Sequence, residues 1–184
     1  MLEIAPGHPE AGALYAQALD QSGDLDLTIE AWEQVFKAPA SRFTGIARER
    51  LRRLYPERGD FYASIDDLDA AVADYGRAVA LAPDDARLQA RYGALLARTA
   101  PDSARAIFER LDLRDEGVAL TVITAWRRAG ELAEAERWLA RLSGEGDGPP
   151  ARLLVALGAD LLPDDPAAAE ACFAQVMARL DGTP

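Results

Sequence analysis

Apolar residues recur along this chain at the three- and four-residue spacing of amphipathic helices. One such stripe contains Leu25, Ile29 and Trp32, and another contains Phe173, Val176 and Leu180. No stretch alternates apolar and polar residues as a half-buried strand does. The pattern predicts ten helices, at residues 9–22, 24–37, 41–55, 60–81, 85–98, 102–111, 116–129, 131–142, 150–162 and 165–180.

A small or helix-breaking residue followed by an acid lies between the first and the second helix of each predicted pair. This mark occurs at Gly23-Asp24, Gly59-Asp60, Pro101-Asp102, Gly130-Glu131 and Asp164-Asp165. Glycine can end a helix in a left-handed conformation, and the acid can cap the next helix at its N-terminus. The acids are 36, 42, 29 and 34 residues apart, which indicates stacked helical repeats. The sequence therefore predicts five antiparallel helix hairpins in a single domain over residues 1–184.

The strongest repeat signal lies in residues 67–97. Residues 67–83 read DLDAAVADYGRAVALAP, and Tyr92, Gly93 and Leu96 follow at the spacing of a next first helix. These residues resemble the tetratricopeptide repeat family. The resemblance implies an all-α fold, a right-handed α-solenoid of about five antiparallel helix hairpins. It also implies a non-catalytic role in binding a protein or peptide.

Residues 41–66 allow two interpretations. Phe61, Ile65 and Leu68 begin an unbroken apolar spacing that continues to residue 79, which favours one long helix over 60–81 with 41–55 as its partner. Alternatively, Gly59, Tyr75 and other signature residues fit an ungapped repeat whose short first helix begins near Pro56. We favour the long helix and leave the exact register in 41–66 open.

Two segments differ in character from the helices. Residues 143–150 are rich in glycine and end in two prolines, which predicts a flexible loop within the domain. Residues 2–6 resemble the tail of a preceding second helix, so the chain could be a fragment of a longer array.

Composition narrows the possible partners. The formal net charge is −11, and a chain this acidic repels nucleic acid over most of its surface. The only cysteine is Cys172, which excludes an internal disulfide. No stretch resembles a signal peptide or a membrane span, so we expect a cytoplasmic protein without nucleic-acid or membrane partners.

Candidate catalytic groups are few. His8 is the only histidine and lies in a Pro-Gly-His-Pro turn, and Cys172 is expected to pack in a helix. The acid pairs at residues 66–67, 84–85 and 164–165 fall at helix starts, where capping explains them. We therefore predict no enzyme activity, no cofactor and no metal. The alternative is a small-ligand regulator or an enzyme built on a helical-repeat frame.

Arginines interrupt the acidic surface. The run from Arg48 to Arg53 places Arg48 and Arg52 on one helix face, where guanidinium groups could bind carboxylates of an acidic partner. A solvated helix, balanced by acids at residues 66, 67 and 69, is the simpler interpretation. The tetratricopeptide resemblance adds a groove lined by first helices. The predicted partner-binding residues are Gln17, Arg48, Arg52, Arg91, Thr124, Arg127 and Arg128.

The last predicted helix carries a second stripe, of small residues. Ala167, Ala171, Ala174 and Ala178 recur on one face. Such a stripe could receive a further helix, so we expect a contact there with a second copy of the chain, giving a homo-oligomer through the terminal helices, or with a partner. Exposed alanine as a good helix former is the competing explanation.

Overall fold

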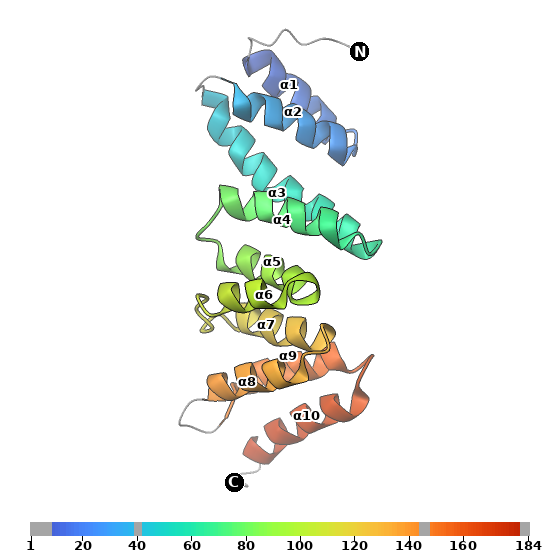
Figure 1. Ribbon diagram of the computed structural model, residues 1–184, viewed down its shortest axis with the longest axis vertical. Coiled ribbons are helices and arrows are strands. Elements are labelled where there is room, and N and C mark those ends of the chain that lie inside the picture. Colours follow the sequence, from blue (N-terminus) through green and yellow to red (C-terminus); the bar gives the residue numbers. More distant parts are fainter. Residues whose placement is uncertain (1–8, 39–41, 144–147, 181–184) are drawn as a thin grey trace. The chain divides into compact units, whose positions relative to one another are not determined.

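The computed structural model describes residues 9–38, 42–143 and 148–180. Every regular element within these residues is a helix, which confirms the all-α helical-repeat prediction (Figure 1). The helices are α1 Pro9–Asp20, α2 Leu25–Lys37, α3 Arg42–Ser64, α4 Leu68–Leu81, α5 Ala86–Thr99, α6 Pro101–Phe108, α7 Glu116–Arg128, α8 Leu132–Ser143, α9 Ala151–Leu161 and α10 Pro166–Leu180.

The chain divides into two compact units. Residues 1–88 form the first unit, with α1–α4, and residues 89–184 form the second, with most of α5 and all of α6–α10. In the first unit α1 packs on α2, and α3 packs on both α2 and α4. In the second unit α7 packs on α8 and α9, and α9 packs on α10. The single domain over 1–184 and its right-handed winding stay predictions, and residues 144–147 of the predicted loop lie outside the described residues.

Local capping starts and ends many of these helices. Gly23 has a φ of 78° and ends the turn before α2, where the Asp24 carboxylate accepts a hydrogen bond from Leu27 N at 3.0 Å. The second acid of each predicted pair also caps a helix: Asp67 accepts from Ala70 N, Asp85 from Leu88 N and Asp165 from Ala168 N. The capping interpretation of the acid pairs is therefore confirmed.

Two of the five predicted marks have another role. Gly59 and Asp60 lie inside α3 rather than between helices. The N-cap of α6 is Ala100, without a side-chain hydrogen bond, and Asp102 lies in the first turn, where it pairs with Arg105 at 2.8 Å. Pro101 occupies the start of α6, where its missing N–H costs nothing.

The prediction of one helix over 60–81 is wrong. The helix predicted at 41–55 continues through Pro56 to Ser64, and the chain turns at residues 65–67 before α4 begins. Phe61 and Ile65 are 56% and 58% exposed, so the apolar spacing that favoured the long helix is not a buried stripe. The alternative interpretation, with a break near residue 66, is right about this turn. It is wrong about the start of the first helix, because α3 begins at Arg42 and not near Pro56.

First and second helices approach each other closely at one glycine in each of three hairpins. A Cβ placed on Gly59 would lie 2.7 Å from the Tyr75 ring, so α3 and α4 need glycine at their contact. The same arrangement recurs in the second unit, where a Cβ placed on Gly93 of α5 would clash with the Phe108 ring and one placed on Gly158 of α9 would lie 2.8 Å from the Phe173 ring. In each hairpin the aromatic residue lies eight positions after the residue that caps the second helix.

Candidate partner-binding site

The predicted partner-binding residues of the first unit lie on α1 and α3. Gln17 is exposed on α1, and Arg48 is exposed on α3 with its guanidinium 6.0 Å from the centre of the Phe36 ring. Arg52 is engaged within the unit: it pairs with Glu49 at 2.8 Å and with Asp85, the cap of α5, at 3.1 Å. Arg52 therefore joins α3 to the start of α5.

The predicted residues of the second unit lie mainly on α7. Arg127 pairs with Asp165 at 2.9 Å and Arg128 with Asp160 at 2.7 Å, so these two arginines join α7 to the α9–α10 hairpin. Thr124 is only 8% exposed, and its hydroxyl donates to the carbonyl oxygen of Leu120 at 2.9 Å. Thr124 does not present its side chain to a partner. Arg91 lies exposed on α5.

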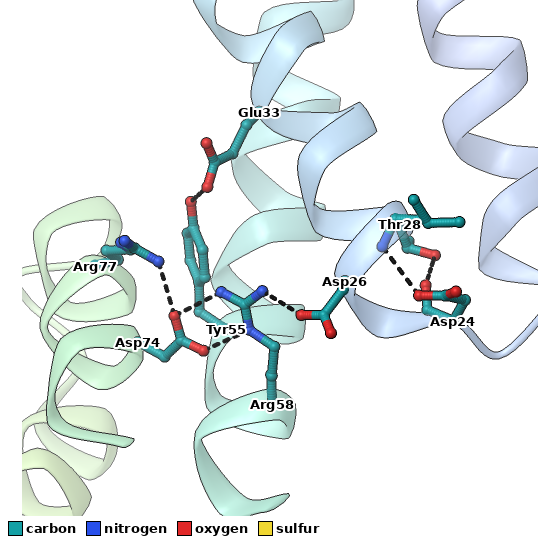
Figure 2. Close-up of polar contacts among 9 residues, drawn as sticks. Asp24, Asp26, Thr28, Glu33, Tyr55, Arg58, Asp74 and Arg77 are labelled. Carbon is teal, nitrogen blue, oxygen red and sulfur yellow. Dashed lines mark hydrogen bonds and ion pairs between the residues drawn. The ribbon is translucent and has the colours of Figure 1, made fainter. Parts of the chain in front are cut away.

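A charged network that the sequence did not predict lies between α2, α3 and α4 (Figure 2). Its centre is Asp74, which is only 1% exposed. Arg58 donates from Nε and Nη2 to the two carboxylate oxygens of Asp74, at 2.6 and 2.8 Å. Arg58 Nη1 reaches Asp26 of α2 at 2.7 Å, and Arg77 reaches Asp74 at 3.0 Å. The bidentate pair raises the pKa of Arg58, so this side chain stays charged.

A second polar contact extends this network along α2. The Tyr55 hydroxyl donates to Glu33 Oε1 at 2.8 Å, and Lys37 pairs with Glu33 at 2.7 Å. Burial, then the neighbouring Glu33 carboxylate, raise the pKa of Tyr55. Burial alone would raise the pKa of Glu33, but the hydrogen bonds from Lys37 and Tyr55 outweigh it and lower that pKa. These contacts favour the ionised form of Glu33, and the network links α2, α3 and α4.

Several arginines of α3 pair with acids of other segments of the first unit. Within the run, Arg50 pairs with Asp20 of α1, and Arg52 pairs with Glu49 of α3 and with Asp85 just before α5. Outside the run, Arg42 pairs with Glu10, and Arg58 pairs with Asp26 and Asp74. These arginines therefore make contacts between helices.

Of the two candidate catalytic residues, the structure describes Cys172 but not His8. Cys172 is buried in α10, and burial raises the pKa of its thiol, which fits a packing residue. His8 lies outside the described residues. Among the residues that the structure describes, no group of three or more His, Cys, Asp or Glu could hold a metal ion. None of the described helices is both long and apolar enough to cross a membrane.

First helices share one accessible face. Two positions are equivalent in the last two hairpins when residues are counted back from the acid before the second helix, Glu131 or Asp165. Ten residues before that acid lie Thr121 and Val155, and three residues before it lie Arg128 and Leu162. Val155 is 45% and Leu162 55% exposed, Arg128 is exposed and Thr121 is half-buried. α7 packs on α9, and these four residues, at equivalent positions of the two hairpins, are here called the α7–α9 face. Of the predicted α7 residues, only Arg128 lies on it.

Comparison with known proteins shows the fold alone. No family model matches the sequence, and no curated protein matches it. Two solved structures are similar over 95% of this chain at 15% identity. The first is the ArsTM double mutant of MamA RS-1, with a TM-score of 0.50 and 95% of that chain covered. The second is residues 41 to the end of MamA from Desulfovibrio magneticus RS-1, with a TM-score of 0.49 and 96% of that chain covered. The first likeness supports a tetratricopeptide-like helical-repeat fold.

The alanine stripe of α10 lies on a face that is also exposed in other hairpins. Ala167, Ala171 and Ala174 are exposed, two, six and nine positions after the cap Asp165. The equivalent positions of α8, two, six and nine residues after Glu131, hold Ala133, Arg137 and Ala140. All three side chains are exposed, although the α9–α10 hairpin follows α8 in the same unit. Helices of one unit therefore do not dock on this face of α8. A contact at the α10 stripe with a second copy or a partner stays a prediction.

Proposed function

We propose that this chain is a non-catalytic scaffold that binds a protein or peptide partner on the α7–α9 face. The observation that carries the proposal is the exposure of Val155 on α9, of Leu162 directly after α9, and of Arg128 at the end of α7, because α7 packs on α9. Apolar side chains that share a face with a charged one provide both contact area and orientation for a peptide. The helical-repeat fold supports this role, because its hairpins present side chains from successive helices side by side.

An acidic partner is not part of this proposal. Arg52 and Arg127, two of the arginines expected to bind carboxylates, already pair with acids of this chain. Arg128 also pairs with Asp160, but its side chain is 66% exposed and can still contact a partner. A partner would therefore gain most from burying Val155 and Leu162.

Affinity capture from the cells that produce the protein tests the proposal. The full chain is compared with a variant that carries Val155→Asp and Leu162→Asp. We expect the wild type to retain a specific protein and the variant to lose it, because two carboxylates in the contact would have to be desolvated. Quantitative mass spectrometry measures the retained proteins, and circular dichroism checks that both chains remain helical.

A matched control places the same substitutions on another exposed face. Ala171→Asp with Ala174→Asp changes the α10 stripe and should leave the captured protein unchanged. Loss of that protein in the control but not in the Val155/Leu162 variant would move the binding surface to α10. Identical captured proteins for wild type, variant and control would remove the α7–α9 face from consideration.

A further inference from the structure

An apolar patch in the first unit lies at the end of α3. Phe61, in the last turn of α3, is 56% exposed, and Ile65, which directly follows the helix, is 58% exposed. The chain contains five phenylalanines, and the other four are buried or half-buried in the structure. Phe61 is therefore the only exposed phenylalanine among the described residues, and the exposed Ile65 follows it in the turn to α4.

The patch is held in a fixed conformation. Backbone hydrogen bonds close the turn after α3, from Ile65 N to Tyr62 O at 3.2 Å and from Asp67 N to Tyr62 O at 2.9 Å. The Tyr62 ring lies 5.9 Å from the Phe61 ring, and the Arg58 guanidinium lies over Tyr62 at 5.8 Å. Since Arg58 is bound to the buried Asp74, the charged network of Figure 2 anchors the base of the patch. A rigid patch loses little entropy when it binds.

The surroundings of the patch are acidic. Residues 57–69 contain five acids and one arginine, a net charge of −4. That arginine, Arg58, is already paired with Asp74 and Asp26. Glu57 is exposed four residues before Phe61 on the same helix, and Asp69 is exposed in the first turn of α4. The field around Phe61 and Ile65 therefore attracts cations and repels acidic partners.

We propose that Phe61 and Ile65 dock a basic amphipathic segment of a protein partner. An apolar side chain of that segment covers Phe61 and Ile65, and its Lys or Arg residues face the acids of residues 57–69. This surface shares no residue with the α7–α9 face, so either proposal can fail while the other stands.

The first experiment uses a defined probe. A fluorescein-labelled helical peptide of about five turns carries Leu at helical spacing and Lys elsewhere, and its counterpart carries Glu in place of Lys. Fluorescence anisotropy measures the affinity of both for the full chain. We expect the Lys peptide to bind at least about tenfold more tightly than the Glu peptide, a preference that added salt reduces. Equal affinities, or no binding of the Lys peptide, would overturn the proposal.

Variants then locate the contact. Phe61→Ser with Ile65→Ser should weaken Lys-peptide binding at least about tenfold, because the buried apolar area is lost. Glu57→Gln with Asp69→Asn should weaken it mainly at low salt. Met177→Ser, at a residue of α10 that is also 56% exposed, is the matched control and should bind like the wild type. Wild-type affinity in the Phe61/Ile65 variant would overturn the proposal.

Two further measurements separate the competing explanations. If a second copy of the chain covers the patch, sedimentation will show a dimer that Phe61→Ser with Ile65→Ser dissociates, and this result would replace the basic partner. The Val155→Asp and Leu162→Asp variant should bind the Lys peptide like the wild type. If it does not, the peptide reports on the α7–α9 face, and the Phe61/Ile65 assignment is wrong.

Discussion

Removing the carboxylate of Asp74 should destabilise the first unit more than any exposed substitution. Asp74→Ala deletes both hydrogen bonds from Arg58 and the contact with Arg77. The Arg58 side chain is only 14% exposed, so its charge would lose its main partner in a largely water-free position. Breaking a buried pair by removing one member costs about 3–5 kcal/mol.

The structure sets the expected value within this range. Arg58 keeps its bond to Asp26 at 2.7 Å, so part of its charge stays compensated. The Arg77 side chain is 54% exposed and can be solvated, so its share is small. We therefore expect Asp74→Ala to lower the free energy of unfolding by about 3 kcal/mol. Arg58→Met with Asp74→Ala should cost less than the sum of the single changes, because no charge is left buried without a partner.

Urea unfolding followed by far-ultraviolet circular dichroism measures these changes in each single variant and in the double variant. Asp69→Ala, at an exposed acid on the same helix, is the control and should cost about 0.5 kcal/mol or less. The reasoning fails if Asp74→Ala costs under about 1 kcal/mol and the two single changes are additive. Such a result would mean that the Arg58–Asp74 pair is solvated and does not hold α3 to α4.

Three further outcomes follow from particular contacts. Glu33 has a lowered pKa in the folded chain, so the stability it contributes is present above its unfolded pKa and is lost as pH falls through its folded pKa. Between roughly pH 5 and 3 the melting temperature of Glu33→Gln should therefore fall less than that of the wild type. Gly59→Ala should cost about 1–3 kcal/mol because its methyl group meets the Tyr75 ring, whereas Gly45→Ala, with open space at its Cβ, should stabilise the chain by about 0.5 kcal/mol. Cys172 should react slowly with a thiol reagent in the folded chain and rapidly in denaturant, and fast reaction in the folded chain would contradict its packing role.

Features that depend on neighbouring residues were predictable from the sequence. Gly23 and Asp24 end one turn and start α2 as expected, and Asp67 and Asp165 cap α4 and α10. These contacts span a few residues, so the sequence contains both partners at a recognisable spacing. The hairpin architecture follows from such signals repeated along the chain.

The turn at residues 65–67 depends on contacts between helices. A helical spacing of Phe61, Ile65 and Leu68 is compatible with one helix, whereas in the structure the chain turns after Ser64 and Gly59 of α3 packs closely on Tyr75 of α4. The length of α3 also contradicts a local rule, because Pro56 lies in its interior. Pro56 is buried among α3 residues that are themselves buried, such as Leu51 and Tyr55. That packing offsets the missing hydrogen bond.

The sequence contains one signal for the central residue of the charged network. Asp74 lies on the stripe of Ala71, Tyr75 and Ala78, all of which are buried, so an acid there requires a cation from another helix. The spacing on one helix cannot identify that cation. Arg58 precedes Asp74 by 16 residues and Arg52 precedes Asp85 by 33, and no local pattern connects such distant partners.

The ion pairs of Arg58 and Arg52 bear on whether a partner is acidic or basic. Lys37 is the only lysine, so nearly every positive charge belongs to an arginine, whose planar group can bridge two helices at once. Arg58 does so between Asp74 and Asp26, and Arg52 between Glu49 and Asp85. An ion pair cancels one positive charge against one negative charge, so these pairs leave the net charge of −11 unchanged. This net negative charge favours a basic partner at Phe61 over the acidic one that the arginine run suggested.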